Sequence, residues 1–205
     1  MDSYFVGQVL YILAYEAAVM YDEKWFNNWI ERIKSEKIEL DNIDTLEVFD
    51  KFLEDVVVAC YNLLRAVKER ELKKKEAEEE LKKMKEMLER DVDLGDDIKN
   101  DLFVMTKESA RLVVRAAEIA LSGKISKKSF EKLLEEALKK EKEGKVEEAF
   151  EVVAMMGAKI FKNEKLPELE FPEESELLEY FDGLDAINTV ILLSEIDAGE
   201  SQEES

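Results

Sequence analysis

The stretch Phe-Leu-Glu-Asp-Val-Val-Val-Ala-Cys-Tyr-Asn-Leu-Leu (Phe52 to Leu64) decides the fold of this chain. It lies within residues 44–70, where apolar side chains recur on nearly every side of the expected helix. A helix with this distribution is buried among other helices. Asp44 and Glu47 have the spacing of a capping box at its start. We therefore expect a central helix over about residues 44–70 that is more deeply buried than any other.

The composition indicates an all-α protein. Only two prolines and seven glycines interrupt 205 residues, and charged residues make up 39% of them. Few helix breakers among many Glu, Lys, Leu and Ala residues are typical of helical proteins. We expect a helical bundle of seven or eight helices. The abundance of Lys and Glu is also the pattern of hyperthermophile proteins, so the sequence predicts a thermostable protein.

The scarcity of cysteine and the absence of histidine exclude several kinds of chemistry. One cysteine, Cys60, and no histidine are present. An internal disulfide and a thiol-only zinc site are therefore excluded. Ser-His-Asp catalysis, Cys-His catalysis and most catalytic zinc sites are excluded too. Cys60 itself lies in the apolar stretch, where we expect a small buried side chain.

Negative charge is concentrated in the last part of the chain. The net charge is −20, and residues 164–205 contribute −13 of it, from 14 acidic side chains and one lysine. No basic surface suited to DNA or RNA is apparent, so we expect no direct contact with nucleic acid. We divide the chain into a helical bundle over 1–163 and an acidic helix and tail over 164–205. The tail, 198–205, is expected to be disordered and the rest packed on the same domain.

The N-terminal segment is almost free of charge. Residues 4–21 contain a single charged side chain, Glu16. The segment is shorter than a typical membrane span and lacks the positive start of a signal peptide. We favour a buried first helix over membrane insertion. A third interpretation is that translation begins at Met20 and that residues 1–19 are not genuine.

Periodic apolar residues place the other helices. A helix beginning at Asp22 carries Trp25 and Trp29, which are expected to anchor the core. A charged helix with a thin apolar stripe is expected over 72–90, where it packs on the outside of the bundle in cis or against another chain. Because neither Gly nor Pro precedes this helix, it can continue the central helix as a single long rod. The further helices are expected over 98–121, about 130–138, 146–161 and 173–196. In the helix over 146–161, Gly157 and Ala158 would allow a close contact with another helix.

Two stretches of sequence resemble a known family. They are Tyr-Asp-Glu-Lys-Trp-Phe-Asn-Asn-Trp-Ile-Glu-Arg-Ile (21–33) and Glu-Asp-Val-Val-Val-Ala-Cys (54–60). Both are similar to an uncharacterised archaeal family of helical proteins with a domain-of-unknown-function label, over residues 21–88. The resemblance implies an archaeal, cytosolic protein and supplies no catalytic residues. The segment before Met20 is not part of it.

Carboxylates on the central helix offer one enzymatic hypothesis. Glu47, Asp50 and Glu54 share one face, and Asp55 lies on the opposite side. Grouped carboxylates on facing helices hold the metal of all-α magnesium-dependent nucleotide pyrophosphatases, and Mg²⁺ needs only oxygen ligands. Because 50 of 205 residues are acidic, however, such spacings also arise by chance. The other interpretation of Asp55 is a buried carboxylate paired with an arginine of the helix over 98–121, either Arg111 or Arg115.

The acidic C-terminal segment supports our first choice of function. Acidic side chains there alternate with apolar ones, a pattern suited to docking on a basic protein, with charge steering the encounter and apolar anchors holding the complex. The candidate partner-binding residues are Phe171, Glu173, Glu174, Glu176, Tyr180 and Phe181. We expect a non-enzymatic protein that needs no cofactor and binds a basic protein or a nucleoprotein. The magnesium-dependent hydrolase and, third, an acidic nucleic-acid mimic are the alternatives, and homo-oligomerisation is left open.

Overall fold

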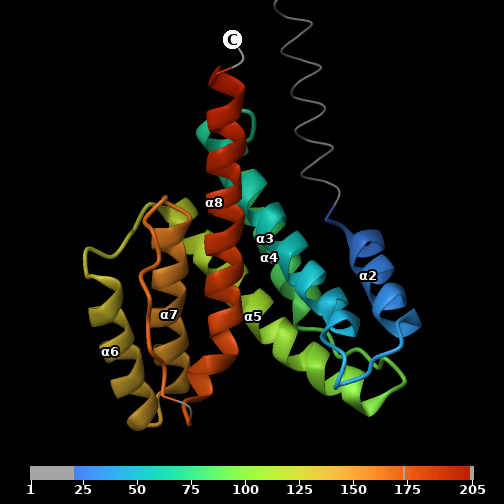
Figure 1. Cartoon of the computed structure of the whole chain (residues 1–205). Coiled ribbons are helices and arrows are strands. Elements are labelled where there is room, and N and C mark those ends of the chain that lie inside the picture. The colour runs from blue at the N-terminus through green and yellow to red at the C-terminus, as the bar shows by residue number, and fades with distance from the viewer. Residues whose placement is uncertain (1–20, 173, 204–205) are drawn as a thin grey trace, which may run out of the picture. The chain divides into compact units, whose positions relative to one another are not determined.

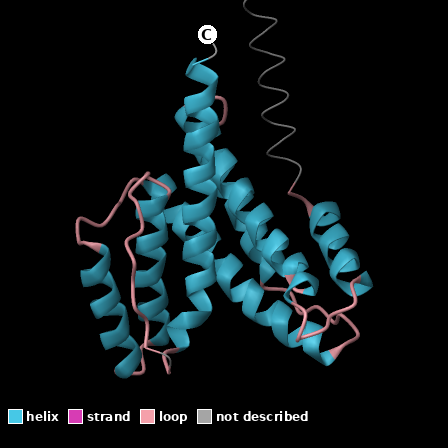
Figure 2. Ribbon diagram, in the orientation of Figure 1, coloured by secondary structure: helices cyan, strands magenta, loops and turns pink. Residues whose placement is uncertain are grey.

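A computed structural model of the chain describes residues 21–172 and 174–203, the last nine of these by their backbone alone (Figure 1). Within this described part the chain forms seven α-helices, two short 3₁₀ helices and no strand (Figure 2). The predicted all-α class is therefore confirmed. None of the described helices combines the length and the apolar character needed to cross a membrane. The expected first helix, the alternative start at Met20 and the last two tail residues lie outside the described residues.

The chain divides into two compact units, which we call unit 1, up to Lys107, and unit 2, from Glu108 onward. α5 (Asp97–Ser122) contributes its first turns to unit 1 and the remainder to unit 2. The domain boundary that we draw at residue 163 rests on charge and stays a prediction.

Unit 1 is built around the central helix of the sequence analysis. Along the chain, unit 1 contains α2 (Glu23–Ser35), η1 (Ile43–Thr45), α3 (Glu47–Lys68) and α4 (Lys74–Leu88), followed by the first turns of α5. α3 is the expected helix, but its start differs from the prediction. Leu46 is the N-cap and supplies no side-chain hydrogen bond, while Asp44 lies in η1, capped by Asn42. The predicted capping box is therefore wrong, because the residues before α3 form a 3₁₀ turn.

The end of α3 separates it from α4, so the two do not form one rod. Arg70 adopts a left-handed backbone conformation, with φ of 63°. The backbone N–H of Glu71 then donates to the carbonyl of Ala66 at 2.8 Å, which satisfies the end of the helix. The thin apolar stripe of α4 is buried in cis, with Leu81 fully buried and Met84 nearly so. The alternative of a coiled-coil arm against another chain is not needed to bury this stripe.

Aromatic rings fill the centre of unit 1. Phe52 on α3 is fully buried. The ring centroids of Trp25 and Trp29 lie 5.9 and 5.8 Å from that of Phe52, and the ring of Phe103 lies 5.5 Å from it. Both tryptophans are themselves half-buried. They contact the core as predicted, with part of each indole left at the surface.

Unit 2 combines the rest of α5 with α6 (Phe130–Lys142), α7 (Val146–Ile160), η2 (Glu176–Tyr180) and α8 (Phe181–Glu203). α6 and α7 form a helical hairpin. Ten of the 15 residues of α7 are buried, against ten of 22 in α3. The prediction that the central helix would be the most buried is therefore wrong. α7 contacts α6, α8 and η2, whereas α3 turns several carboxylates to the solvent.

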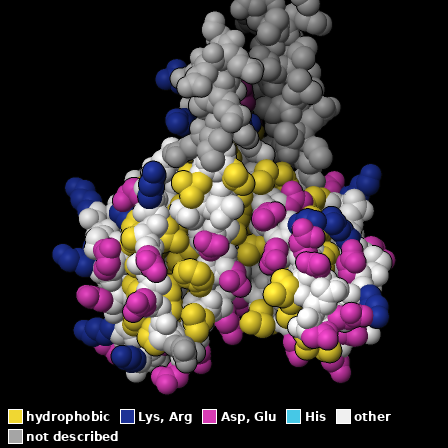
Figure 3. All heavy atoms as spheres, in the orientation of Figure 1, with side chains coloured by type: hydrophobic (Ala, Val, Ile, Leu, Met, Phe, Trp, Pro, Cys, Tyr) yellow, Lys and Arg dark blue, Asp and Glu magenta, His cyan; other side chains and the backbone are white. Residues whose placement is uncertain are grey.

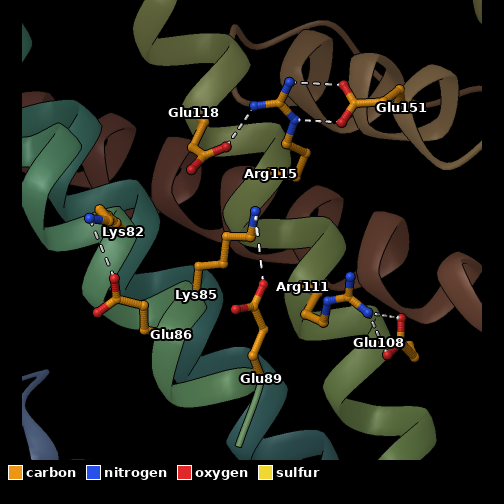
Figure 4. A network of polar contacts seen from close by, with 9 residues as sticks. All are labelled: Lys82, Lys85, Glu86, Glu89, Glu108, Arg111, Arg115, Glu118 and Glu151. Atoms are coloured by element: carbon orange, nitrogen blue, oxygen red, sulfur yellow. Dashed lines mark hydrogen bonds and ion pairs between the residues drawn. The ribbon is translucent and has the colours of Figure 1, made fainter. Parts of the chain in front are cut away.

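A close helix contact and an ion pair join α5 to α7. A Cβ atom placed on Gly157 would lie 2.7 Å from the Cβ of Ala116, so only glycine fits there without movement. This confirms the predicted close contact at Gly157. The guanidinium of Arg115 donates to both carboxylate oxygens of Glu151 at 2.8 and 2.9 Å, and to Glu118 at 2.7 Å (Figure 4). These ion pairs raise the pKa of Arg115, most strongly through the hydrogen bond with Glu151.

The last helix begins and ends later than the sequence predicts. η2 precedes α8, which starts at Phe181 and continues to Glu203. Residues 198–203 are thus helical where we expect a disordered tail. A Cβ atom on Gly183 would lie 2.8 Å from the backbone oxygen of Ser109, so this glycine lets α8 approach α5 closely.

Candidate functional site

A groove of about 380 Å³ opens on unit 2, and we call it the acidic groove. It lies where the end of α6 and the turn to α7 meet the segment that precedes η2. The lining residues are Leu138, Glu141, Lys142, Gly144, Val146, Pro172, Glu174, Ser175 and Glu176. Two parts of the chain that are about 30 residues apart in sequence therefore form one surface.

The segment between α7 and η2 is held in place at both ends, and this builds one wall of the groove. At its start, the buried ammonium group of Lys159 pairs with Glu164 at 2.7 Å and donates to the backbone oxygen of Ser126 at 3.3 Å. At its end, the hydroxyl of Ser175 lies 2.9 Å from both carboxylate oxygens of Glu141. Since a hydroxyl has one proton, it donates to one of these oxygens at a time.

The groove carries negative charge over an apolar floor. Glu141 is half-buried, and Glu174 and Glu176 are exposed. Among the lining residues that the structure describes, the ammonium of Lys142 stands against these three carboxylates, which leaves a net charge of −2. Half-buried Leu138 and Val146, which is 40% exposed, supply the apolar surface. Across the visible face of the molecule, acidic side chains are likewise interspersed with apolar ones (Figure 3).

The six candidate partner-binding residues fall into different environments. Glu174 and Glu176 line the groove, whereas Glu173 lies outside the described residues. Phe171 and Phe181 are half-buried and pack edge to face, with ring centroids 5.4 Å apart. Tyr180 is 9% exposed and packs against Phe150 at 5.2 Å. Burial and then the charge of Glu108 raise the pKa of the Tyr180 phenol.

The three carboxylates on one face of α3 do not converge on a common point. Glu47 pairs with Lys51 at 2.9 Å, and both Asp50 and Glu54 are exposed. Partial burial, and then the charge of Glu47, raise the pKa of Asp50. Among the side chains that the structure describes, no three acidic or cysteine groups gather in a way that could hold a metal ion.

Asp55 has partners that the sequence analysis did not foresee. The indole N–H groups of Trp25 and Trp29 both donate to its Oδ2 atom, at 2.7 and 2.8 Å. Arg111 instead pairs with Glu108, and Arg115 with Glu118 and Glu151 (Figure 4). Within unit 1 the two indoles are thus the partners of Asp55, and its predicted pairing with an arginine of unit 2 stays a prediction. The repeat of tryptophan one turn apart on α2 is the signal that could have identified this site, because both indoles face α3.

This cluster predicts a dependence of stability on alkaline pH. Burial, followed by the charges of Asp55 and Cys60, raises the pKa of Tyr21 to about 12. In the unfolded chain a tyrosine ionises near pH 10. Because the unfolded state loses the proton first, the contribution of Tyr21 is complete below about pH 10 and is lost as pH rises toward about 12. Denaturant titrations across this range should show a shallower loss of stability in Tyr21→Phe than in the parent, and parallel curves would contradict this assignment.

The residues of the acidic groove that come from α6 and α7 were missed by sequence reasoning. Leu138, Glu141 and Val146 belong to an ordinary hairpin pattern, and their relation to Ser175 depends on the path of the segment after α7. The turn at Gly144 and Lys145 connects α6 to α7. Its glycine, with φ of +72°, allows α7 to start beside the end of α6.

Comparison with known proteins places the chain in a family. No curated protein matches it, and no solved structure does either. Residues 19–199 match a family described as an uncharacterized protein conserved in archaea (DUF2150), which extends the likeness seen over 21–88 to α5 through α8. The chain, with its two all-α units, belongs to this archaeal family.

Proposed function

We propose that this protein is a non-enzymatic binding protein whose acidic groove takes up a basic segment of a partner protein. The observation that carries the proposal is the combination of Glu141, Glu174 and Glu176 around the apolar surface of Leu138 and Val146. A lysine or arginine side chain has an aliphatic stem and a cationic end, so it fits such a surface with its stem on the floor and its charge at the rim.

The fixed geometry of the groove supports this proposal. Ser175 is buried and hydrogen-bonded to Glu141, so the wall that carries Glu174 and Glu176 is held against α6 before a partner arrives. A preformed surface loses less conformational entropy on binding than a disordered acidic tail does. The charge of −13 over residues 164–205 would steer a cationic partner toward this region.

Neutralising the groove should weaken the binding of a basic probe. A fluorescent lysine-rich peptide, titrated with the full chain, is expected to bind Glu174→Gln/Glu176→Gln about 10-fold more weakly than the parent, mainly through slower association. The two glutamates are exposed, so folding stability should be unchanged. Raising the salt concentration from 0.1 M to 1 M shortens the Debye length from about 10 Å to about 3 Å, so parent and variant should converge.

The matched control is Glu168→Gln/Glu170→Gln. These two glutamates are exposed, lie in the same acidic segment and do not line the groove. The control removes the same charge from the chain, so it should retain most of the affinity. Equal weakening by both double variants would show binding by the acidic segment as a whole and would overturn the groove as the site.

A further inference from the structure

Three large apolar side chains of unit 1 are exposed, two on the connection between α2 and α3 and one at the start of α5. Ile43 and Leu40, in the connection between α2 and α3, are 81% and 62% exposed. Ile98, in the first turn of α5, is 44% exposed. We call the surface formed by Leu40, Ile43 and Ile98 the connection face. Large apolar side chains that are this exposed on one end of a folded unit are typical of interaction sites.

The connection between α2 and α3 and the start of α5 lie at the same end of unit 1 (Figures 1 and 2). The ammonium group of Lys99, in the first turn of α5, is buried and donates to the backbone oxygen of Lys34 at the end of α2, at 2.7 Å. The hydroxyl of Thr45 accepts from the backbone N–H of Glu39 and donates to the backbone oxygen of the same residue, at 3.0 Å each. These bonds hold the apolar side chains on a defined backbone.

The charges around the connection face identify its partner. Residues 36–47 and 91–101 contain ten acidic side chains and two lysines, a net charge of −8. One lysine is Lys99, which is already buried, and the other, Lys37, pairs with Glu39 at 2.5 Å. A second copy of this chain seated on the same surface would bring two such acidic fields together, which opposes self-association.

We propose that the connection face docks a cationic amphipathic segment of a partner protein, whose apolar side chains contact Leu40, Ile43 and Ile98 while its lysines or arginines meet the surrounding acids. Charge complementarity requires that the partner segment be positively charged, and the three apolar side chains require that it also carry apolar anchors. This surface differs from the acidic groove, which lies in unit 2 and has its apolar atoms in a recess. The inference therefore does not depend on the proposed function of the groove.

The test uses the full chain and two synthetic peptides of equal charge, one of lysine and leucine and one in which serine replaces each leucine. Isoleucine methyl NMR signals report the site directly. Addition of the lysine–leucine peptide should shift the signals of Ile43 and Ile98 and leave that of the buried Ile160 in place. The lysine–serine peptide should shift them much less, because it lacks the anchors.

In the variant Leu40→Ser/Ile43→Ser, the affinity of the connection face for the lysine–leucine peptide, followed by the Ile98 methyl signal, should be about 10-fold weaker. Its control is Leu192→Ser/Leu193→Ser, which alters two exposed leucines of α8 in unit 2, 38% and 56% exposed, and should bind as the parent does. Unchanged Ile43 and Ile98 signals, equal response to both peptides, or a parent chain that dimerises through this face would overturn the proposal. In Glu174→Gln/Glu176→Gln, which weakens the acidic groove, the lysine–leucine peptide should still shift the Ile43 and Ile98 signals, so a failure of the groove and a failure of the connection face are told apart.

Discussion

Replacement of Phe52 by alanine should lower the free energy of unfolding of unit 1 by about 3–5 kcal/mol. The phenyl ring is fully buried and lies within 6 Å of the ring centroids of Trp25, Trp29 and Phe103. Its removal loses the transfer free energy of the ring and leaves a cavity between α2, α3 and α5 that the surrounding helices cannot fully close. This is the largest loss that we expect from a single substitution in the chain.

Tryptophan fluorescence measures this effect in unit 1 alone, since the only two tryptophans of the sequence lie in α2. Denaturant titration of Phe52→Ala should give a transition at much lower denaturant concentration than the parent. Phe52→Leu, which keeps most of the volume, should lose far less. A loss of under about 1 kcal/mol in Phe52→Ala would mean that the aromatic cluster is not the centre of unit 1.

Replacement of Gly157 by valine should destabilise unit 2 by about 3 kcal/mol, at the upper end of what overpacking usually costs. The first added carbon would lie 2.7 Å from the Cβ of Ala116 and 3.1 Å from a methyl group of Ile187. Both contacts are shorter than ordinary van der Waals distances, so α5 and α7 must separate. Hydrogen exchange of the α7 amides should become faster.

A swap of the two residues separates overpacking from helix propensity. Gly157→Ala alone introduces the contact with Ala116, and Ala116→Gly alone costs about 1 kcal/mol through helix propensity. In the double variant the methyl group moves from one helix to the other, and the 2.7 Å clash between the Cβ positions of residues 116 and 157 disappears. The double variant should be more stable than the sum of the two single effects predicts. Strict additivity would show that the helices do not meet at these residues.

Periodicity in the sequence was sufficient for the class of fold and for most helices. The apolar pattern over 44–70 predicted α3 nearly to its ends, and the thin stripe before Arg90 predicted α4. Prediction from periodicity failed where the backbone departs from helical geometry. The left-handed conformation at Arg70 breaks what reads as one rod, although neither Gly nor Pro stands there to indicate a turn.

The candidate site was less predictable because its parts meet only after folding. The charge of residues 164–205 pointed to Glu174 and Glu176, which the groove brings together with the end of α6. The contribution of Glu141 depends on its hydrogen bond with Ser175, 34 residues away. From its spacing in the sequence, Asp55 could be expected to form an ion pair. The folded structure shows instead that α2 lies beside α3 and that two indoles donate to this carboxylate.

The position of a bound basic segment on the full chain decides whether the acidic groove is the binding site. A lysine-rich peptide with a photo-reactive group can be bound at low salt, cross-linked by light and mapped by mass spectrometry. We predict cross-links to the floor and rim of the acidic groove, at Leu138, Val146 and Pro172. Cross-links that spread along residues 164–205 without these three, or that fall on the connection face alone, would contradict the assignment of the groove as the binding site.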